Sequence, residues 1–175
     1  ARRLREDCAT LGFTLPAFGD YAVGMVFLPR NAATGDQCAA FFEEFIASEG
    51  QTLLGWRDVP TNSEFLGESV KPNEPVVRQV FIGRSKDLKS VEDFERRLFV
   101  IRKQIHRAVR TSGLEGQADF YITTPSSRTI VYKGMVLPGN SPNYYLDLND
   151  ERRESAPPLF PQRSSHITFP PLNLP

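Results

Sequence analysis

The sequence predicts a layered α+β domain, and three observations carry that prediction. The first is an apolar run at 21–29 that is typical of a buried strand, closed by Pro29. The second is a stretch at 90–113 in which apolar residues recur at steps of three and four, as on one face of a helix. The third is the expected order of elements along the chain, which is strand, helix, strand, strand, helix and hairpin.

A helix is expected after the first strand. Asp36 could cap its N-terminus, and it would run to about Glu49, with Gly50 where a C-terminal cap is expected. Its apolar stripe consists of Cys38, Phe41, Phe42 and Phe45. The second strand is expected at 51–59, which contains the only tryptophan of the chain.

The clearest helix follows a third strand at 75–83. Ser90 begins it, and Glu92 and Asp93 lie in its first turn, where carboxylates favour the positive end of the helix dipole. Gly113 ends it. Its apolar face comprises Phe94, Leu98, Ile101, Ile105 and Ala108. The rest of its surface is basic, with Arg96, Arg97, Arg102, Lys103, Arg107 and Arg110.

The last third of the chain changes character. Two strand-like runs, 119–123 and 128–135, are joined by Thr124-Pro125-Ser126-Ser127, which predicts a hairpin. From about residue 155 the prolines are so frequent that regular structure is excluded for most of the length.

Bulk properties exclude several classes of function. Lys+Arg and Asp+Glu balance at 21 each, so no net field favours nucleic acid or an anionic membrane. No apolar run approaches the roughly 20 residues that span a bilayer, and the basic start has no apolar stretch behind it, as a secretory signal would. The chain starts at Ala1 rather than Met, so we expect either processing or a piece cut from something longer. Cys8 and Cys38 form no metal-ligand motif, which favours a reduced, cytoplasmic compartment.

Five blocks of this sequence resemble the amidotransferase domain of glutamate synthase large subunits. They occur in the family's order and with family-like spacing, between roughly Cys8 and Ala156. The most specific is Ser126-Ser127-Arg128-Thr129-Ile130-Val131-Tyr132-Lys133-Gly134-Met135. The other four are at 20–29, 54–60, 74–81 and 99–103.

The resemblance implies an N-terminal-nucleophile hydrolase fold, which is a four-layer αββα sandwich of antiparallel sheets. It also implies hydrolysis of glutamine to glutamate and ammonia. The ammonia would then travel to a flavin site, where glutamate is made from 2-oxoglutarate. The partners implied are glutamine and the remaining domains of glutamate synthase. Flavin mononucleotide and an iron–sulfur cluster are expected in those domains and no cofactor in this chain. On this view residues 1–156 are a partial amidotransferase domain and 157–175 are a divergent proline-rich tail.

The catalytic centre of the family is not found in this sequence. The family's nucleophile is a cysteine at the mature N-terminus whose own α-amino group, with a pKa of roughly 8, serves as the base. Here the first residue is Ala1, and neither Cys8 nor Cys38 matches that segment. No match to the family's oxyanion-stabilising Asn-Gly segment is found either. We therefore assign no catalytic residue and expect the isolated chain to be inactive.

Arg163 is the only residue to which the resemblance assigns a substrate contact. It follows the family-like Glu154-Ser155-Ala156 phrase and matches an arginine that pairs with the glutamine α-carboxylate. A guanidinium group suits a carboxylate because two parallel N–H···O bonds fix its orientation. The alternative is that Arg163 is a solvated arginine in the proline-rich tail.

Other polar residues have ordinary structural explanations. His106 and His166 have no recognisable Ser/Asp partner, so triad chemistry is not predicted. Arg128 and Lys133 are expected to form a salt bridge or anchor a turn. The basic face of the 90–113 helix is expected to be solvated rather than to bind RNA.

Two alternatives to the amidotransferase segment stay open. One is a degenerate amidotransferase fold that serves as a non-catalytic binding or assembly module. The other is an unrelated hydrolase that uses Cys8 or Cys38, although Cys38 lies on an apolar stripe where cysteines are usually inert. Open sheet edges lead us to expect a marginally stable or self-associating protein.

Overall fold

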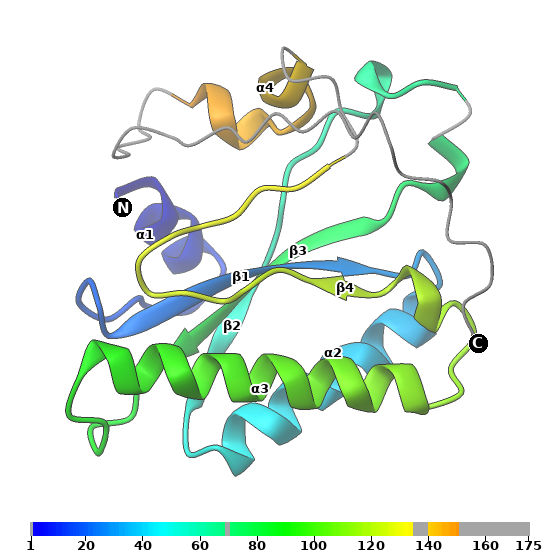
Figure 1. Ribbon diagram of the computed structural model, residues 1–175. Coiled ribbons are helices and arrows are strands. Elements are labelled where there is room, and N and C mark those ends of the chain that lie inside the picture. Colours follow the sequence, from blue (N-terminus) through cyan, green and yellow to red (C-terminus); the bar gives the residue numbers. More distant parts are fainter. Residues whose placement is uncertain (1, 69–70, 135–139, 151–175) are drawn as a thin grey trace, which may run out of the picture.

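The computed structural model describes residues 2–68, 71–134 and 140–150. These residues form a four-stranded antiparallel sheet with the strand order β2-β3-β1-β4 (Figure 1). The strands are β1 (Tyr21–Leu28), β2 (Thr52–Asp58), β3 (Val76–Gly83) and β4 (Tyr121–Ile122). The α-helices are α1 (Arg2–Thr10), α2 (Ala32–Ser48), α3 (Val91–Thr111) and α4 (Ser141–Tyr144). Short 3₁₀ helices are η1 (Ser63–Phe65), η2 (Lys71–Asn73), η3 (Gln117–Asp119) and η5 (Leu146–Asn149).

Helices α2 and α3 lie side by side and cover one face of the sheet (Figure 1). Because side chains alternate along a strand, every second residue of β1 and β3 points into this layer. The resulting core is fully apolar and consists of Ala22, Val26, Leu28, Cys38, Phe42, Ile46, Val80, Ile82, Phe94, Leu98, Ile101, Ile105, Val109, Phe120 and Ile122.

The opposite face of the sheet is covered by α1, α4 and η5. Two smaller apolar clusters lie there, one around Cys8 and Phe81 and one around Met25 and Tyr145. Buried polar residues, including Arg57 and Gln79, lie on this face as well. The two faces therefore differ in chemistry, since the core under α2 and α3 is mainly hydrophobic and the other face is mixed.

The strands predicted at 21–29, 51–59, 75–83 and 119–123 and the α+β class are confirmed, and the sheet is antiparallel as expected. The start of the first long helix was predicted wrongly. The helix α2 begins at Ala32, because the side chain of Asn31 accepts a hydrogen bond from the Thr34 backbone N–H at 3.3 Å and so takes the capping role given to Asp36. Gly50 lies just beyond the C-terminus with φ 70°, as expected of a terminating glycine.

The long amphipathic helix is confirmed as α3. The Ser90 hydroxyl caps it by accepting from the Asp93 N–H at 3.0 Å. Four of the five predicted apolar positions are fully buried, and the fifth buried position is Val109 rather than Ala108. Val109 follows Ile105 by four residues and so stays on the same face, whereas Ala108 lies at its margin.

The predicted hairpin is wrong. The segment after β4 does not turn at Thr124, because Ser126 still bridges to Val23 on β1. The Thr123 hydroxyl takes part in that ladder by accepting from the Met25 N–H at 3.0 Å. In the described part of the second run, 128–134, no strand forms.

Gly55 provides a test of the packing on β2. A Cβ atom at this position would lie 2.6 Å from the Phe13 ring, whose centroid is 5.4 Å from that of Phe81. We expect Gly55→Ala to lower the free energy of unfolding by about 1–3 kcal/mol, because the ring must leave its position. Gly67→Ala is the control, since nothing lies within 4 Å of its added Cβ. Urea denaturation of both variants measures the difference, and equal stabilities would contradict this packing.

Candidate functional site

Arg57 is a buried charge at the centre of the mixed face of the sheet. It lies on β2 opposite Gln79 of β3, and its side chain is 5% exposed. Burying a guanidinium group without partners is very costly, so its surroundings must neutralise it. The residues that do so come from segments far apart in the chain.

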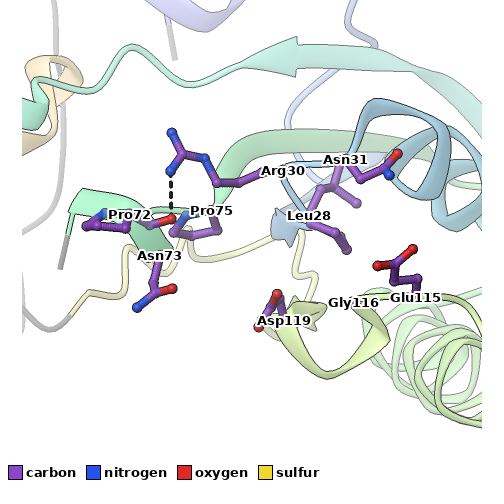
Figure 2. A pocket seen from close by; sticks show the side chains of 10 residues that line it. Leu28, Arg30, Asn31, Pro72, Asn73, Pro75, Glu115, Gly116 and Asp119 are labelled. Carbon is purple, nitrogen blue, oxygen red and sulfur yellow. Dashed lines mark hydrogen bonds between the residues drawn. The ribbon is translucent and has the colours of Figure 1, made fainter. Parts of the chain in front are cut away.

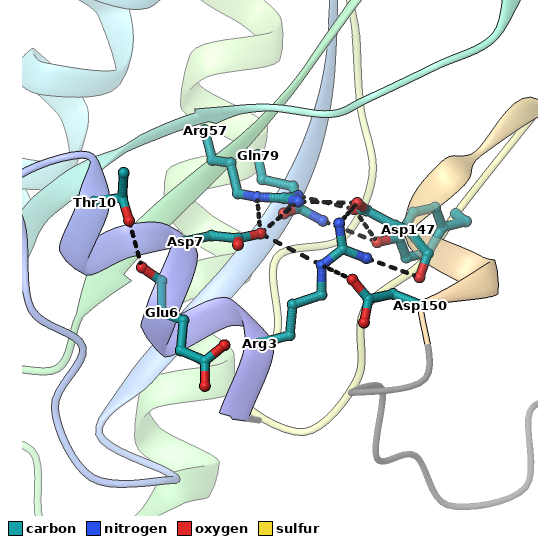
Figure 3. Close-up of polar contacts among 9 residues, drawn as sticks. Arg3, Glu6, Asp7, Thr10, Arg57, Gln79, Asp147 and Asp150 are labelled. Atoms are coloured by element: carbon teal, nitrogen blue, oxygen red, sulfur yellow. Dashed lines mark hydrogen bonds and ion pairs between the residues drawn. The ribbon is translucent and has the colours of Figure 1, made fainter.

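Asp147 of η5 is the main partner of Arg57. Their contact is bidentate, with Nη1 2.8 Å from Oδ2 and Nη2 2.9 Å from Oδ1 (Figure 3). Arg57 Nε also donates to Asp7 Oδ2 of α1 at 3.0 Å, and Nη1 donates to Gln79 Oε1 at 3.0 Å. All three nitrogens of the guanidinium group are therefore paired.

A second set of contacts surrounds this pair. The Tyr132 hydroxyl donates to Asp147 Oδ2 at 2.9 Å and accepts from Gln79 Nε2 at 3.4 Å. Arg3 donates to the Asp147 backbone oxygen at 3.0 Å and to its carboxylate, and its Nε lies 3.3 Å from Asp150 Oδ2. We call these seven residues the Arg57 cluster: Arg3, Asp7, Arg57, Gln79, Tyr132, Asp147 and Asp150.

The charges in the Arg57 cluster stabilise one another. Burial disfavours the charged form of Arg57, but the hydrogen bonds and charge of Asp147 outweigh burial and raise the Arg57 pKa above its ordinary value. Burial likewise opposes ionisation of Asp147, and the contacts from Arg57 outweigh it and lower the Asp147 pKa. Burial and the Asp147 charge together raise the pKa of Tyr132, so the phenol stays protonated and donates.

The Arg57 cluster is therefore built to hold structure in place. Asp147 is 4% exposed, and its carboxylate accepts from Arg57, Tyr132 and Arg3. An acid or base for catalysis needs a proton-transfer partner within reach and a pKa near the working pH. The shifts here move the pKa values of Asp147 and Tyr132 away from neutrality.

A separate hollow of about 210 Å³ opens where β1 leads into α2. Figure 2 shows Arg30 at its rim, where the side chain donates to the Pro72 backbone oxygen at 2.7 Å. Glu115 and Asp119 line the other side. All three charged side chains are exposed, so the hollow has no buried polar group that would fix a ligand.

The two cysteines are unsuited to nucleophilic catalysis. Cys8 and Cys38 are fully buried and unpaired. Burial, only partly offset by the charge of Arg57, raises the pKa of the Cys8 thiol to about 11, and burial raises that of Cys38. Since the thiolate is the nucleophile, both side chains are unreactive packing groups near neutral pH.

Arg163, His166 and His106 are the remaining residues considered in the sequence. Arg163 and His166 lie outside the described residues. His106 lies on α3, where burial and then the charges of Arg110, Arg102 and Lys103 lower its pKa.

The salt bridge predicted for Arg128 is confirmed, whereas Lys133 makes a different contact. Arg128 forms an ion pair with Glu92 of α3. Lys133 donates to the Tyr121 hydroxyl at 2.6 Å and lies over that ring. Glu95 of α3 holds the segment that links β4 to Arg128, because its carboxylate accepts from the Ser127 N–H and hydroxyl at 2.7 Å each.

Sequence reasoning missed the Arg57 cluster. One signal was present, because an arginine at position 57 follows the apolar residues of a strand and would point into the protein. Its partners Asp7 and Asp147 are 50 and 90 residues away, and their sequence positions give no indication of that contact.

The described part of the chain offers neither a cluster of metal ligands nor a helix suited to a membrane. Within 2–68, 71–134 and 140–150, no group of three or more His, Cys, Asp or Glu side chains is arranged to hold a metal ion. None of the helices in those ranges has the length and apolar character needed to cross a membrane.

Comparisons with known proteins give a consistent result. The family model described as "Glutamine amidotransferases class-II" matches residues 1–175. "Glutamate synthase [NADPH] large chain" of Bacillus subtilis (strain 168) is 43% identical over 166 residues, which cover 95% of this chain and 10% of that protein. The protein of the same name from Azospirillum brasilense is 40% identical over 150 residues, covering 85% of this chain and 10% of that protein. "Ferredoxin-dependent glutamate synthase 1, chloroplastic/mitochondrial" of Arabidopsis thaliana is 37% identical over 148 residues, covering 85% of this chain and 9% of that protein. The chain thus spans about a tenth of the length of these relatives.

The buried pair predicts a large cost for removing its cation. We expect Arg57→Met to lower the free energy of unfolding by about 3–5 kcal/mol, because Asp147 stays buried without its main partner. Arg128→Met is the matched control, since it removes an exposed arginine paired with Glu92 and should change little. Chemical denaturation of both variants checks this, and equal losses would contradict the central role of Arg57.

The lowered Asp147 pKa predicts a pH dependence of stability. A carboxyl group whose pKa is lower in the folded state stabilises fully above its unfolded-state pKa, about 3.9 for Asp. That contribution is lost as the pH falls through the lower folded-state value. We therefore expect the stability of the native sequence to decline more steeply below about pH 4 than that of Asp147→Asn. Parallel slopes in denaturation curves collected across this pH range would contradict the prediction.

Proposed function

We infer the function of this chain from its family: the chain belongs to the class-II glutamine amidotransferases. We propose that it is a segment of the glutamine-hydrolysing domain of a glutamate synthase, where it helps to supply ammonia for glutamate synthesis from 2-oxoglutarate. The observation that carries this proposal is the 43% identity over 95% of the chain to a glutamate synthase large chain.

The Arg57 cluster supports the proposal from the structural side. Three of the five family-like blocks contribute to it, with Arg57 from 54–60, Gln79 from 74–81 and Tyr132 from 126–135. Blocks that are separate in sequence therefore meet at one buried network. The resemblance covers the residues that hold this sheet to its flanking segments, as expected if the chain shares the family's scaffold.

In this proposal the residues that bind and hydrolyse glutamine lie outside the described part of the chain. We propose that glutamine is the substrate and that Arg163 pairs with its α-carboxylate through two parallel hydrogen bonds. The nucleophile and the oxyanion donors would come from other parts of the parent enzyme. Flavin mononucleotide and the iron–sulfur cluster would lie in further domains, and a cytoplasmic location remains part of the proposal. The division into 1–156 and a tail at 157–175 also remains a prediction.

The isolated chain is expected to release no ammonia from glutamine, because neither buried thiol can serve as a nucleophile. Purified chain is assayed for ammonia with and without prior thiol alkylation under native conditions. Release that alkylation abolishes would identify Cys8 or Cys38 as a nucleophile and contradict the proposal. Full-length parent enzyme serves as the positive control, and a parent that releases no ammonia would favour a non-catalytic assembly module.

Arg163 is tested in the full-length parent. We expect Arg163→Met to raise KM for glutamine by about 30-fold or more, in line with the cost of leaving a charged partner unpaired. Use of free ammonia as the nitrogen source should not change, because it bypasses glutamine binding. Arg128→Met is the control, since that arginine pairs with Glu92 on the surface. An unchanged KM would leave Arg163 as a solvated side chain.

A further inference from the structure

The outer surface formed by α2 and α3 carries opposite charges on its two helices. The α2 sequence contains Asp36, Glu43 and Glu44 and no basic residue. The α3 sequence contains more basic than acidic residues, and its basic side chains are Arg96, Arg97, Arg102, Lys103, Arg107 and Arg110. One ion pair, between Arg97 and Glu49, joins the two helices at their seam. The layer therefore presents an acidic strip beside a basic strip.

Several of these charges have no partner among the described residues. Within that part of the chain no ion pair involves Glu43, Glu44, Arg107 or Arg110, and all four side chains are exposed. Lys103 is exposed too and lies over the Phe99 ring, with Nζ 5.5 Å from its centroid. Among the described residues these charges are therefore left to solvent or to a contact outside that part of the chain.

The same surface exposes large apolar side chains on α3. Phe99 is 50% exposed and Val100 is 40% exposed. On a helix Phe99, Lys103 and Arg107 follow one another at steps of four, so they form a single ridge. The outer side of α2 has small exposed residues, Ala40 and Ala47, beside the carboxylates. One helix thus offers bulk and positive charge, and the other offers space and negative charge.

We propose that this surface binds a second copy of the chain, with α3 of each copy lying on α2 of the other. This arrangement arises when a twofold axis lies between the two helix layers and runs along the helices. The axis places α3 of the first copy on α2 of the second, and α2 of the first copy on α3 of the second. The same interaction is then formed at two symmetric places, as in an isologous dimer. A twofold axis across the helices would instead place α3 on α3 and bring like charges together.

Self-complementarity is the reason to choose a second copy. A partner of a single charge sign would match only one of the two strips. The chain itself has both strips side by side, and its formal net charge is zero, so two copies do not repel one another over long distances. The proposal does not depend on glutamine hydrolysis and can fail or succeed independently of it.

The first experiment measures the association of the native chain by sedimentation velocity over a range of concentrations. We expect a monomer–dimer equilibrium that weakens about tenfold or more when the salt concentration rises from about 0.05 M to 0.5 M, because exposed charges are screened. A native chain that stays monomeric at millimolar concentration would overturn the proposal.

The decisive experiment uses two charge-reversed variants. Glu43→Lys/Glu44→Lys makes the strip on α2 basic, and Lys103→Glu/Arg107→Glu makes that on α3 acidic. Each variant alone then faces like charges at both symmetric contacts and should be monomeric. Mixed in equal amounts, they restore opposite charges at both contacts and should form a 1:1 dimer.

The control variant is Glu64→Lys/Glu115→Lys, which reverses two exposed carboxylates outside the layer and should dimerise like the native chain. Circular dichroism and thermal melts establish that all variants are folded. Continued self-association of both charge-reversed variants would assign the contact to another surface, such as the exposed edge of β2, and overturn the proposal. Failure of the mixture to dimerise would overturn it as well.

Discussion

The bidentate contact between Arg57 and Asp147 is the interaction on which one side of this structure depends. It joins the second strand to a short 3₁₀ helix 90 residues later and draws in α1 through Asp7 and Arg3. Such a buried pair stabilises less than its Coulomb attraction suggests, because both charges lose water. It also constrains geometry, since a misplaced η5 would separate the buried Arg57 guanidinium group from its main partner.

The two faces of the sheet solve the burial problem in different ways. Under α2 and α3 the core is mainly apolar, so its stability comes from apolar area removed from water. On the other face the Arg57 cluster demands fixed donor and acceptor positions. The family-like blocks at 54–60, 74–81 and 126–135 contribute to this second face. The family-like blocks therefore include residues that hold the sheet to its flanking segments.

The helix layer contributes differently again. Its inward side is a conventional hydrophobic face, while its outward side separates acidic α2 from basic α3. The net charge of zero hides this separation, because the two strips cancel in the sum. The inward side can be deduced from periodicity alone. The outward pattern acquires meaning only when the two helices are known to be neighbours.

The sequence alone determined the four strands of the sheet, the long amphipathic helix, the α+β class and the family resemblance. These follow from local patterns, as the confirmed Ser90 cap and the buried side chains of Phe94, Leu98, Ile101 and Ile105 illustrate. Tertiary structure decided the cap at Asn31, the path of 121–126 along β1 and the Arg57 cluster. The last two depend on contacts between distant segments. The cap depends on whether Asn31 or Asp36 begins the helix, which the tertiary structure decides. Periodicity records which side of an element is buried but not which distant residue meets it there.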